Sequence, residues 1–488
     1  MKERRPDGAQ GPLRQGGPAI ADLLASYAAR RTTATAVAQR HLARIGRLDP
    51  ALHAFIEVDE TGALRAAAEA DARIAAGSPR SLEGIPVAIK ANIAVAGLGW
   101  SAGMEARRGV VAQNDAASVR LLRTAGAVIL GTLNMHEAAF GATTDNPWFG
   151  RAMNPHRAGY TPGGSSGGSG AAVAAGLCVA ALGSDTLGSV RIPAAYNGIY
   201  GLKPTHGAIS SEGLVPLASD LDTVGPLTRS LDDLEVLTRV LLPGPGGAAP
   251  RRADAGEPGR CEVDVGRAGL CTPSPQRPDP QESAKRPPAL RRLLVLQSLA
   301  EEWCEPAITA AYQLASAALG ALSAESISLP HPLARVRLAA FMVAGRALAT
   351  QPHIVRASAA AGLTAELVKL LEICGQRSEL DLVTDQEVLT RTAAALRACV
   401  EPDAVLLLPT TPQAAFAHTP RPPSSQASFT VLASIAGLPA ISLPAGCNAD
   451  GLPLGVQLVG PGGRELELIA LARALDARLS GYVPPLLE

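Results

Sequence analysis

The chain has 488 residues with 44 basic and 44 acidic side chains, so its formal net charge is zero. This balance gives no electrostatic reason to expect binding to nucleic acid or to an anionic membrane, and an aromatic content of 3% argues against base-stacking surfaces. Hydrophobic residues make up 47% of the sequence, which is enough to bury a sizeable core.

Cysteine and histidine usage gives no sign of a metal site or a disulfide framework. The seven cysteines stand singly, and the eight histidines form no motif such as HExxH. An odd number of isolated cysteines is typical of reduced thiols in the cytosol. We therefore expect a cytoplasmic protein that needs neither a metal nor another cofactor.

The N-terminal segment at 1–17 is basic and lacks the apolar core of a signal peptide, so we expect a disordered leader. The longest nearly apolar run, at 170–183, is too short to cross a bilayer. The sequence therefore predicts no membrane association.

Helical and strand patterns alternate along the first part of the chain. Apolar residues recur at helical spacing between 19 and 76, and we expect helices that cover the following segments. A short buried strand at 85–89 leads into Lys90, and a helix at 116–125 precedes a strand at 128–131. This order is typical of a sheet with helices on both faces.

The middle of the chain contains a long loop and an unusual insertion. A loop rich in Gly, Pro, Asn and Thr spans 141–170 and closes with TPGGSSGGSG, and an alanine-rich helix and a strand near 179–183 follow. Between 244 and 289 the chain is rich in Pro, Gly, Arg and Asp and poor in large apolar residues. Such a segment cannot bury enough surface to offset its ordering entropy, so we expect it to be disordered.

After this insertion the pattern returns to strands and helices. LRRLLVL is a predicted strand, helices follow to about residue 398, and DAVLLLPTTP and LPAISLPAG are two further buried strands. An amphipathic helix is predicted near 465–479. We therefore predict an α/β protein in which residues 18–488 form a single large domain, with a mixed, mostly parallel central sheet covered on both faces by helices.

Three segments contain residues that could carry chemistry. Lys90, at the end of an apolar strand, either reaches water or lies in a dry pocket, where burial would lower its pKa and make the amine a neutral base. GGSSGGSG at 163–170 is by itself a flexible turn, because Ser169 stands where a phosphate-binding loop requires lysine. In GSDTLGSVRIPAA, backbone amides next to Ser189 could stabilise an oxyanion. Ser189 does not lie in a GxSxG elbow, which argues against an α/β-hydrolase.

Together these segments resemble the amidase signature family. The GGSSGG loop with Ser165 precedes the GSDTLGS loop with Ser189 by 24 residues (189 − 165), and Lys90 lies upstream of both. Other stretches resemble the family in the same order: GIPVAIKANI, NMHEAAFGATTDNPWFG, GIYGLKPTHG, LDTVGPLTRS, GLPAISLPAG and GLPLGVQLVGP. The resemblance covers 20–240 and 290–480 and implies the amidase signature fold.

The resemblance implies an amidohydrolase that cleaves a carboxamide C–N bond through an acyl-enzyme. It assigns Ser189 as the nucleophile, Ser165 as a bridging serine on a cis peptide, and Lys90 as the general base, because a serine hydroxyl needs a base to become a nucleophile. The implied oxyanion hole consists of the backbone N–H groups of Thr186, Leu187, Gly188 and Ser189. A small-molecule amide is the expected substrate, and a homodimer is suggested by the resemblance alone.

Two residues depart from the family pattern. Leu187 stands where most relatives have glycine, and a positive φ there would strain the leucine by about 1–2 kcal/mol. Its side chain could also narrow the substrate pocket. Ala91 replaces the acidic residue that often follows the lysine, which would help to keep Lys90 neutral.

Residues near the motifs have simpler interpretations. His136 and Glu137 are expected in a helical stretch that holds a loop, and Asp185 and Arg191 are expected to make structural hydrogen bonds around the nucleophile turn. The remaining candidates for substrate contact are Thr143, Thr144 and Asn146.

Three other functions remain open at this point. The first is hydrolysis of urea-like amides of the biuret or allophanate type. The second is the glutaminase subunit of a tRNA-dependent amidotransferase, although such relatives usually have glutamine after the arginine and Ile192 follows Arg191 here. The third is a catalytically silent binding protein, for which Leu187 is the only support.

Overall fold

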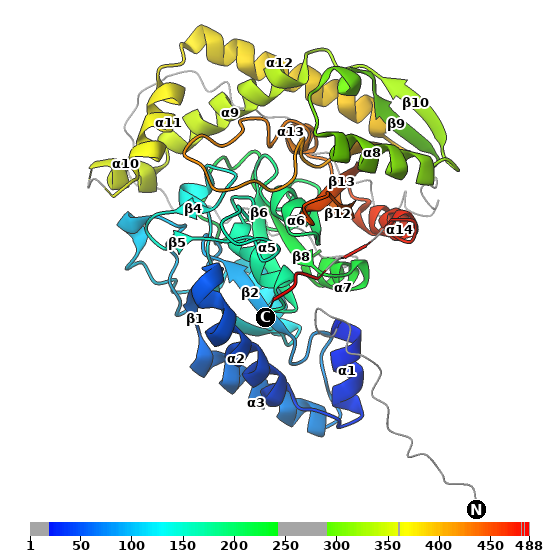
Figure 1. Ribbon diagram of the computed structural model, residues 1–488. Helices are drawn as coiled ribbons and strands as arrows, with labels where there is room; N and C mark the ends of the chain where they lie inside the picture. Colours follow the sequence, from blue (N-terminus) through cyan, green and yellow to red (C-terminus); the bar gives the residue numbers. More distant parts are fainter. Residues whose placement is uncertain (1–18, 243–289, 360–361, 480, 483, 488) are drawn as a thin grey trace, which may run out of the picture.

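The computed structural model describes residues 19–242, 290–359, 362–479, 481–482 and 484–487 (Figure 1). The predicted leader at 1–17 and the predicted insertion at 244–289 lie outside the described residues. None of the helices described is long and apolar enough to cross a membrane.

An 11-stranded mixed sheet runs through the described chain in the order β1-β3-β2-β6-β8-β7-β12-β13-β11-β9-β10. Its strands are β1 (Phe55–Val58), β2 (Pro86–Lys90), β3 (Val128–Leu133), β6 (Ala180–Asp185), β7 (Tyr200–Lys203), β8 (Thr223–Thr228), β9 (Arg292–Leu296), β10 (Ser323–Ile327), β11 (Ala404–Pro409), β12 (Ala440–Cys447) and β13 (Pro453–Val459). Parallel pairs form two runs, β3-β2-β6 and β11-β9-β10, and antiparallel pairs connect them. The predicted mixed α/β sheet is confirmed. A separate two-stranded ribbon pairs β4 (Asp145–Asn146) with β5 (Gly150–Arg151).

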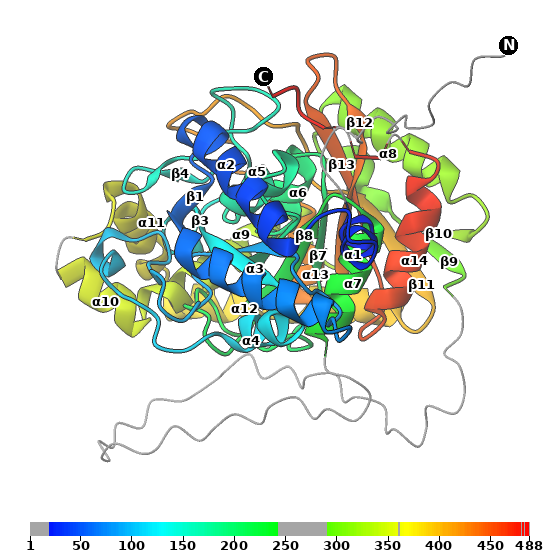
Figure 2. The same ribbon diagram turned by 90° about the horizontal axis from the view of Figure 1, so that it is seen from below.

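The helices before the insertion pack around the β3-β2-β6 part of the sheet. They are α1 (Ile20–Ala28), α2 (Ala34–Leu52), α3 (Glu60–Ala75), α4 (Ala117–Thr124), α5 (Gly167–Ala174), α6 (Arg191–Tyr196) and α7 (Leu231–Leu241), with the 3-10 turns η1 (Glu105–Arg107) and η2 (Glu137–Ala139). Figure 2 views the molecule from the side of α2 and α3, which pack against each other and against β3. The start of α2 is fixed by Thr33, whose hydroxyl accepts the Ala36 N–H.

The helices after the insertion cover the β12-β13-β11 part of the sheet. They are α8 (Pro306–Ala318), α9 (Leu333–Ala349), α10 (Pro352–Ala359), α11 (Ala365–Gly375), α12 (Glu379–Val400), α13 (Thr430–Ile435) and α14 (Glu465–Asp476), with the 3-10 turn η4 (Gln297–Glu301). Figure 1 shows α9, α11 and α12 together at one end of the molecule and α1, α2 and α3 at the other.

Strand β11 shows how both faces of the sheet are covered. Val405 and Leu407 pack in the same apolar cluster as α8 and α14, whereas Leu406 and Leu408 pack in the cluster of α9, α12 and α13. Successive side chains of a strand point to opposite faces, so an all-apolar strand is what a doubly covered sheet requires.

The register of two strands brings the predicted catalytic segments together. β2 and β6 are parallel neighbours, with Val87 opposite Ala180 and Ile89 opposite Leu182. Parallel strands end at the same edge of a sheet, so Lys90 lies beside the segment that follows Leu182. The glycine-rich loop ends at the same place, because α5 begins at Gly167.

Candidate active site

The Lys90 side chain is fully buried at the end of β2. Its Nζ atom lies 2.7 Å from Ser165 Oγ, 2.9 Å from Ser184 Oγ and 3.4 Å from the Ser184 carbonyl. The Asn92 amide also donates to Ser184 Oγ, at 2.9 Å. Lys90 therefore lies in a polar pocket inside the protein and does not reach solvent.

Burial lowers the pKa of Lys90 to about 7, although the carboxylates of Asp185 and Asp222 act in the opposite direction. A lysine in water is almost fully protonated at neutral pH, whereas one with a pKa of about 7 is in large part a free amine. The environment of Lys90 is therefore suited to a base.

Ser165 lies between Lys90 and the glycine-rich loop, on a cis peptide bond with Gly164. Its side chain is fully buried, and its carbonyl accepts the His136 N–H at 3.0 Å. The hydroxyl of Ser165 is thus in direct contact with the buried amine.

Ser189 lies on the turn after β6 and is only 9% exposed. The backbone joins it to the glycine-rich loop, because the Ser166 N–H donates to the Ser189 carbonyl at 3.2 Å. Among the contacts of the described residues there is no direct hydrogen bond between the hydroxyls of Ser165 and Ser189. The structure therefore brings Lys90 and Ser165 into contact and joins Ser189 to this pair through the backbone.

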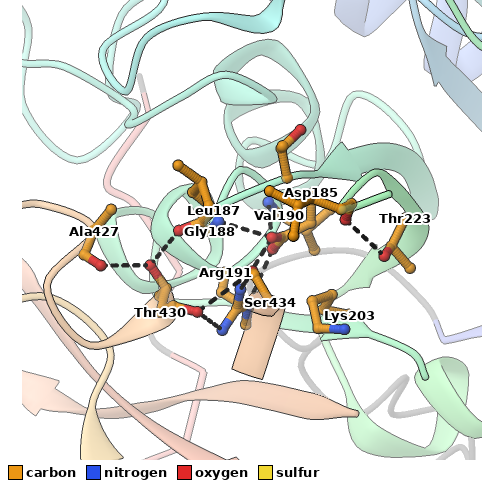
Figure 3. Close-up of polar contacts among 12 residues, drawn as sticks. Asp185, Leu187, Gly188, Val190, Arg191, Lys203, Thr223, Ala427, Thr430 and Ser434 are labelled. Carbon is orange, nitrogen blue, oxygen red and sulfur yellow. Dashed lines mark hydrogen bonds and ion pairs between the residues drawn. The ribbon is translucent and has the colours of Figure 1, made fainter. Parts of the chain in front are cut away.

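A buried ion pair holds the turn that carries Ser189 (Figure 3). The Arg191 guanidinium donates to both oxygens of Asp185 at 3.0 Å, and neither side chain is exposed. Arg191 also donates to the Thr430 carbonyl, to Gln457 Oε1 and to Ser434 Oγ. Burial alone would raise the pKa of Asp185, but the Arg191 charge and hydrogen bonds lower it below its ordinary value. The expected structural role of Asp185 and Arg191 is confirmed by these contacts.

Asp185 also narrows the predicted oxyanion hole. The Gly188 N–H donates to Asp185 Oδ1 at 2.7 Å, and the Val190 N–H donates to Asp185 Oδ2 at 3.1 Å. The Gly188 amide is therefore used inside the turn and is not a free donor, so its inclusion in the hole was wrong. Of the four predicted donors, the N–H groups of Thr186, Leu187 and Ser189 meet no acceptor in the described part of the chain.

The departure at Leu187 causes no backbone strain. Among the described non-glycine residues with positive φ, Leu187 does not occur. Its neighbour Gly188 has the demanding conformation, with φ of +137°, and a Cβ atom at that position would lie only 2.3 Å from Thr430 Oγ1. The Thr430 hydroxyl also donates to the Leu187 carbonyl at 2.6 Å (Figure 3). Leucine is thus compatible with the turn, and the glycine is needed one residue later.

A second contact fixes the predicted oxyanion segment from the other side. The Thr186 hydroxyl donates to Asp222 Oδ1 at 2.6 Å, and the N–H groups of Leu217 and Ala218 donate to Asp222 Oδ2. Burial raises the pKa of Asp222 to about 6. Asp222 therefore connects the Thr186 side chain with the loop that contains Leu217.

Ser189 opens into a cavity of about 730 Å³. The segment before the glycine-rich loop, helices α9 and α11, and the residues before α13 supply its walls. Most of the lining is apolar and includes Phe140, Ile192, Leu217, Phe341, Leu370 and Val431. The charged residues of the lining are Arg337 and Glu366.

The other residues singled out from the sequence divide into lining and structural groups. His136 and Thr143 line the cavity, 3.3 Å apart through Nδ1 and Oγ1. Thr144 donates to the Gly163 carbonyl, and Asn146 donates to the carbonyls of Gly103 and Met135, so these two support the backbone and do not face the cavity.

Glu137 begins the short 3-10 turn η2, where a helical stretch was expected. Its carboxylate accepts hydrogen bonds from Trp148 and from the backbone of Thr364, so it holds the loop as predicted. Sequence reasoning missed Ser184, Asp222 and Thr430. Ser184 lies inside the GSDTLGS segment and could have been found there, whereas Thr430 carries no local signal.

Comparison with known proteins gives consistent results. A sequence model of the amidase family matches residues 36–469. The glutamyl-tRNA(Gln) amidotransferase subunit of Synechococcus sp. (strain WH7803) that this chain resembles is 34% identical, over 94% of this chain and 96% of the relative.

Two solved structures match nearly the whole chain. One is described as "An unexpected vestigial protein complex reveals the evolutionary origins of an s-triazine catabolic enzyme", with 30% identity, a TM-score of 0.82, and coverage of 96% of this chain and 100% of the other. The native peptide amidase from Stenotrophomonas maltophilia has 30% identity and a TM-score of 0.76, covering 97% of this chain and 99% of the other.

Proposed function

The chain belongs to the amidase family of amide-cleaving hydrolases, and we propose that it acts alone on a small carboxamide with an apolar acyl group. The observation that carries this proposal is the 2.7 Å contact between the buried Lys90 amine and the Ser165 hydroxyl, next to a largely apolar cavity that Ser189 lines. Binding cavities of this kind take most of their affinity from apolar contacts and their orientation from a few polar groups.

In the proposed mechanism, neutral Lys90 accepts the proton of the Ser165 hydroxyl while Ser165 accepts that of Ser189. The Ser189 oxygen then attacks the amide carbon, and the N–H groups of Thr186, Leu187 and Ser189 stabilise the oxyanion. The relay returns the proton to the leaving nitrogen, the C–N bond breaks, and water later hydrolyses the acyl-serine. Catalytic hydrogen bonds are often long before substrate binds, so the Ser165–Ser189 step is expected to shorten in the complex.

An ammonia-release assay tests this proposal. Wild-type protein is offered aliphatic amides, aromatic amides, biuret, allophanate and glutamine at equal concentrations. We expect the highest kcat/KM for amides with apolar acyl groups, because such groups bury surface in the cavity at about 25 cal/mol per Å².

A fluorophosphonate probe tests the role of Ser189 without knowledge of the substrate. The wild-type protein should be labelled on Ser189 and the Ser189→Ala variant should not. A folded wild-type protein that takes up no probe would contradict the acyl-enzyme and would favour a silent binding protein. With Leu187 free of strain, that alternative has lost its only support.

A second candidate is hydrolysis of glutamine within a larger enzyme. It is favoured by the similarity, over nearly the full chain, to a protein named as a glutamyl-tRNA(Gln) amidotransferase subunit. Glutamine carries both an ammonium and a carboxylate, and the cavity offers Glu366 and Arg337 as possible partners. However, Ile192 places an apolar side chain in the cavity where relatives of this type usually have glutamine.

Purification from the native host distinguishes the two candidates. A stand-alone enzyme hydrolyses apolar amides without other chains. A glutaminase subunit would co-purify with partner chains and would prefer glutamine over every apolar amide. Hydrolysis of biuret or allophanate is the least favoured, because these small polar molecules would leave most of the 730 Å³ cavity unfilled.

A further inference from the structure

A second cavity, of about 930 Å³, adjoins the cavity that Ser189 lines. Four residues line both cavities and form their common wall: His136, Phe140, Glu366 and Leu370. The second cavity is more polar, because the carboxylates of Glu137, Asp145 and Glu366 lie in its lining together with His418. A substrate that extends past Phe140 and Leu370 would therefore pass from an apolar space into an acidic one.

His418 presents an unsatisfied acceptor in this second cavity. Its side chain is only 2% exposed, and its Nε2 lies 2.9 Å from the Ala152 carbonyl, so Nε2 carries the proton and donates. Nδ1 has no hydrogen-bond partner and lies 3.9 Å from Asp145 Oδ2. In the neutral ring Nδ1 is an acceptor, so two acceptors face each other with no donor between them. Buried polar atoms are rarely left in this state, which indicates that a donor from outside the chain belongs here.

Glu366 supplies an uncompensated charge at the wall between the cavities. Asp145 is paired with Arg151 at 2.9 Å, and Glu137 accepts hydrogen bonds from Trp148 and Thr364. Glu366 has no ion pair and no side-chain hydrogen bond within the described residues. Partial burial, with Asp145 adding to it, raises the pKa of Glu366. The remaining cation of the lining, Lys369, is exposed on the same helix.

We propose that the second cavity binds an ammonium group of the substrate, with Glu366, Asp145 Oδ2 and His418 Nδ1 as its acceptors. An ammonium group has three N–H donors and one positive charge, which matches three acceptors and an unpaired carboxylate. This inference rests on the proposed function and specifies its substrate class. The substrate is an amide whose apolar chain lies along Phe140 and Leu370 and ends in a primary amine.

Two matched pairs of amides test the proposal and show on which side of the scissile bond the amine lies. Hexanamide and 6-aminohexanamide differ by a charge on the acyl side, and N-butylacetamide and N-(4-aminobutyl)acetamide differ by a charge on the leaving-group side. In one of the pairs, the wild-type enzyme should prefer the charged member by about fivefold in kcat/KM, as for a partly exposed ion pair.

The variant Glu366→Gln keeps the shape of the side chain and should remove this preference. It should fold normally, because Glu366 is exposed and has no partner to lose. Glu372→Gln is the matched control, since Glu372 is an exposed carboxylate of the same helix outside both cavities and its loss should leave the preference unchanged. Equal kcat/KM within both pairs, or a preference that survives Glu366→Gln, would overturn the proposal.

A binding measurement separates this inference from the proposed function. n-Hexylammonium should raise the melting temperature of the inactive Ser189→Ala variant, and n-hexanol at the same concentration should not. The shift should disappear when Glu366→Gln is added. If no amide is hydrolysed while this shift is present, the proposed function fails and the ammonium site stands. Equal shifts for the two compounds would overturn the site.

Discussion

The Nζ atom of Lys90 lies 2.7 Å from Ser165 Oγ, although 75 residues separate the two along the chain. A second buried lysine shows why this contact matters. Burial lowers the pKa of Lys203 to about 7 as well, but its Nζ donates to the Pro204 carbonyl at 2.8 Å and meets no hydroxyl group in the described chain. Both amines can lose their proton near neutral pH, and only that of Lys90 has a hydroxyl whose proton it can accept.

Replacement of Lys90 by methionine should lower kcat by at least about a hundredfold, because the base is removed while the apolar stem is kept. In the wild type, kcat/KM should rise with pH through about 7, since only the deprotonated amine can accept the Ser165 proton. Steady-state rates between pH 5 and pH 9, roughly two units on either side of that pKa, measure both effects.

Lys203→Met is the control for this assignment. Its buried amine titrates in the same range, so the variant should keep the rise of kcat/KM near pH 7 if Lys90 is responsible. A rise that disappears in folded Lys203→Met but persists in Lys90→Met would show that Lys203, and not Lys90, is the titrating base.

The Asp185–Arg191 pair yields a prediction about stability. Arg191→Met should lower the free energy of unfolding by about 3–5 kcal/mol, because it leaves the fully buried Asp185 carboxylate without its partner. Denaturant unfolding measures the loss. Arg191→Lys should recover only a part, since one ammonium cannot reproduce the donors that reach Asp185, the Thr430 carbonyl, Gln457 and Ser434.

Removal of both charges is the informative comparison. Asp185→Asn combined with Arg191→Met should be less destabilising than the sum of the two single changes, because no lone charge stays buried. Additive losses would show that the ion pair is not the interaction that holds the turn.

The sequence predicted the elements that position the site better than it predicted the site's supporting contacts. The apolar run before Lys90 and the alanine-rich helix after the glycine loop gave β2 and α5 within a few residues. Strands β7 and β13 went unrecognised as strands, because YGLK and PLGVQLV are short and carry Gly or Pro, which weaken a strand pattern.

Contacts between distant segments could not be predicted in this way. Thr430 reaches the Leu187 carbonyl across 243 residues, and no local pattern marks a threonine for that role. The use of the Gly188 N–H by Asp185 spans only three residues, yet it depends on a turn conformation that the sequence does not specify. Chain patterns thus predict which residues share an edge of the sheet, whereas the tertiary packing decides which amides stay free.

Leu187→Gly tests whether the leucine distorts the oxyanion segment. Since Leu187 has no positive φ, the change should relieve no strain and should cost about 0.5–1 kcal/mol from added chain freedom. Turnover of small amides should stay within a few fold, and KM for amides with bulkier acyl groups should fall as the cavity widens. A clear gain in stability measured by thermal unfolding would contradict an unstrained leucine.

The hydroxyl of Thr430 is the only described side-chain donor to the Leu187 carbonyl, and it fixes the peptide that precedes Gly188. Thr430→Val keeps the shape of the side chain and removes the donor, which leaves a buried carbonyl unpaired at a cost of about 1–3 kcal/mol. Because the Leu187 N–H belongs to the proposed oxyanion hole, we expect kcat to fall about tenfold or more while KM changes little, as for a group that acts in the transition state. Thr430→Ser restores the hydroxyl and should recover most of the rate. If Thr430→Val and Thr430→Ser lose stability and kcat to the same extent, the methyl group and not the hydrogen bond positions the segment.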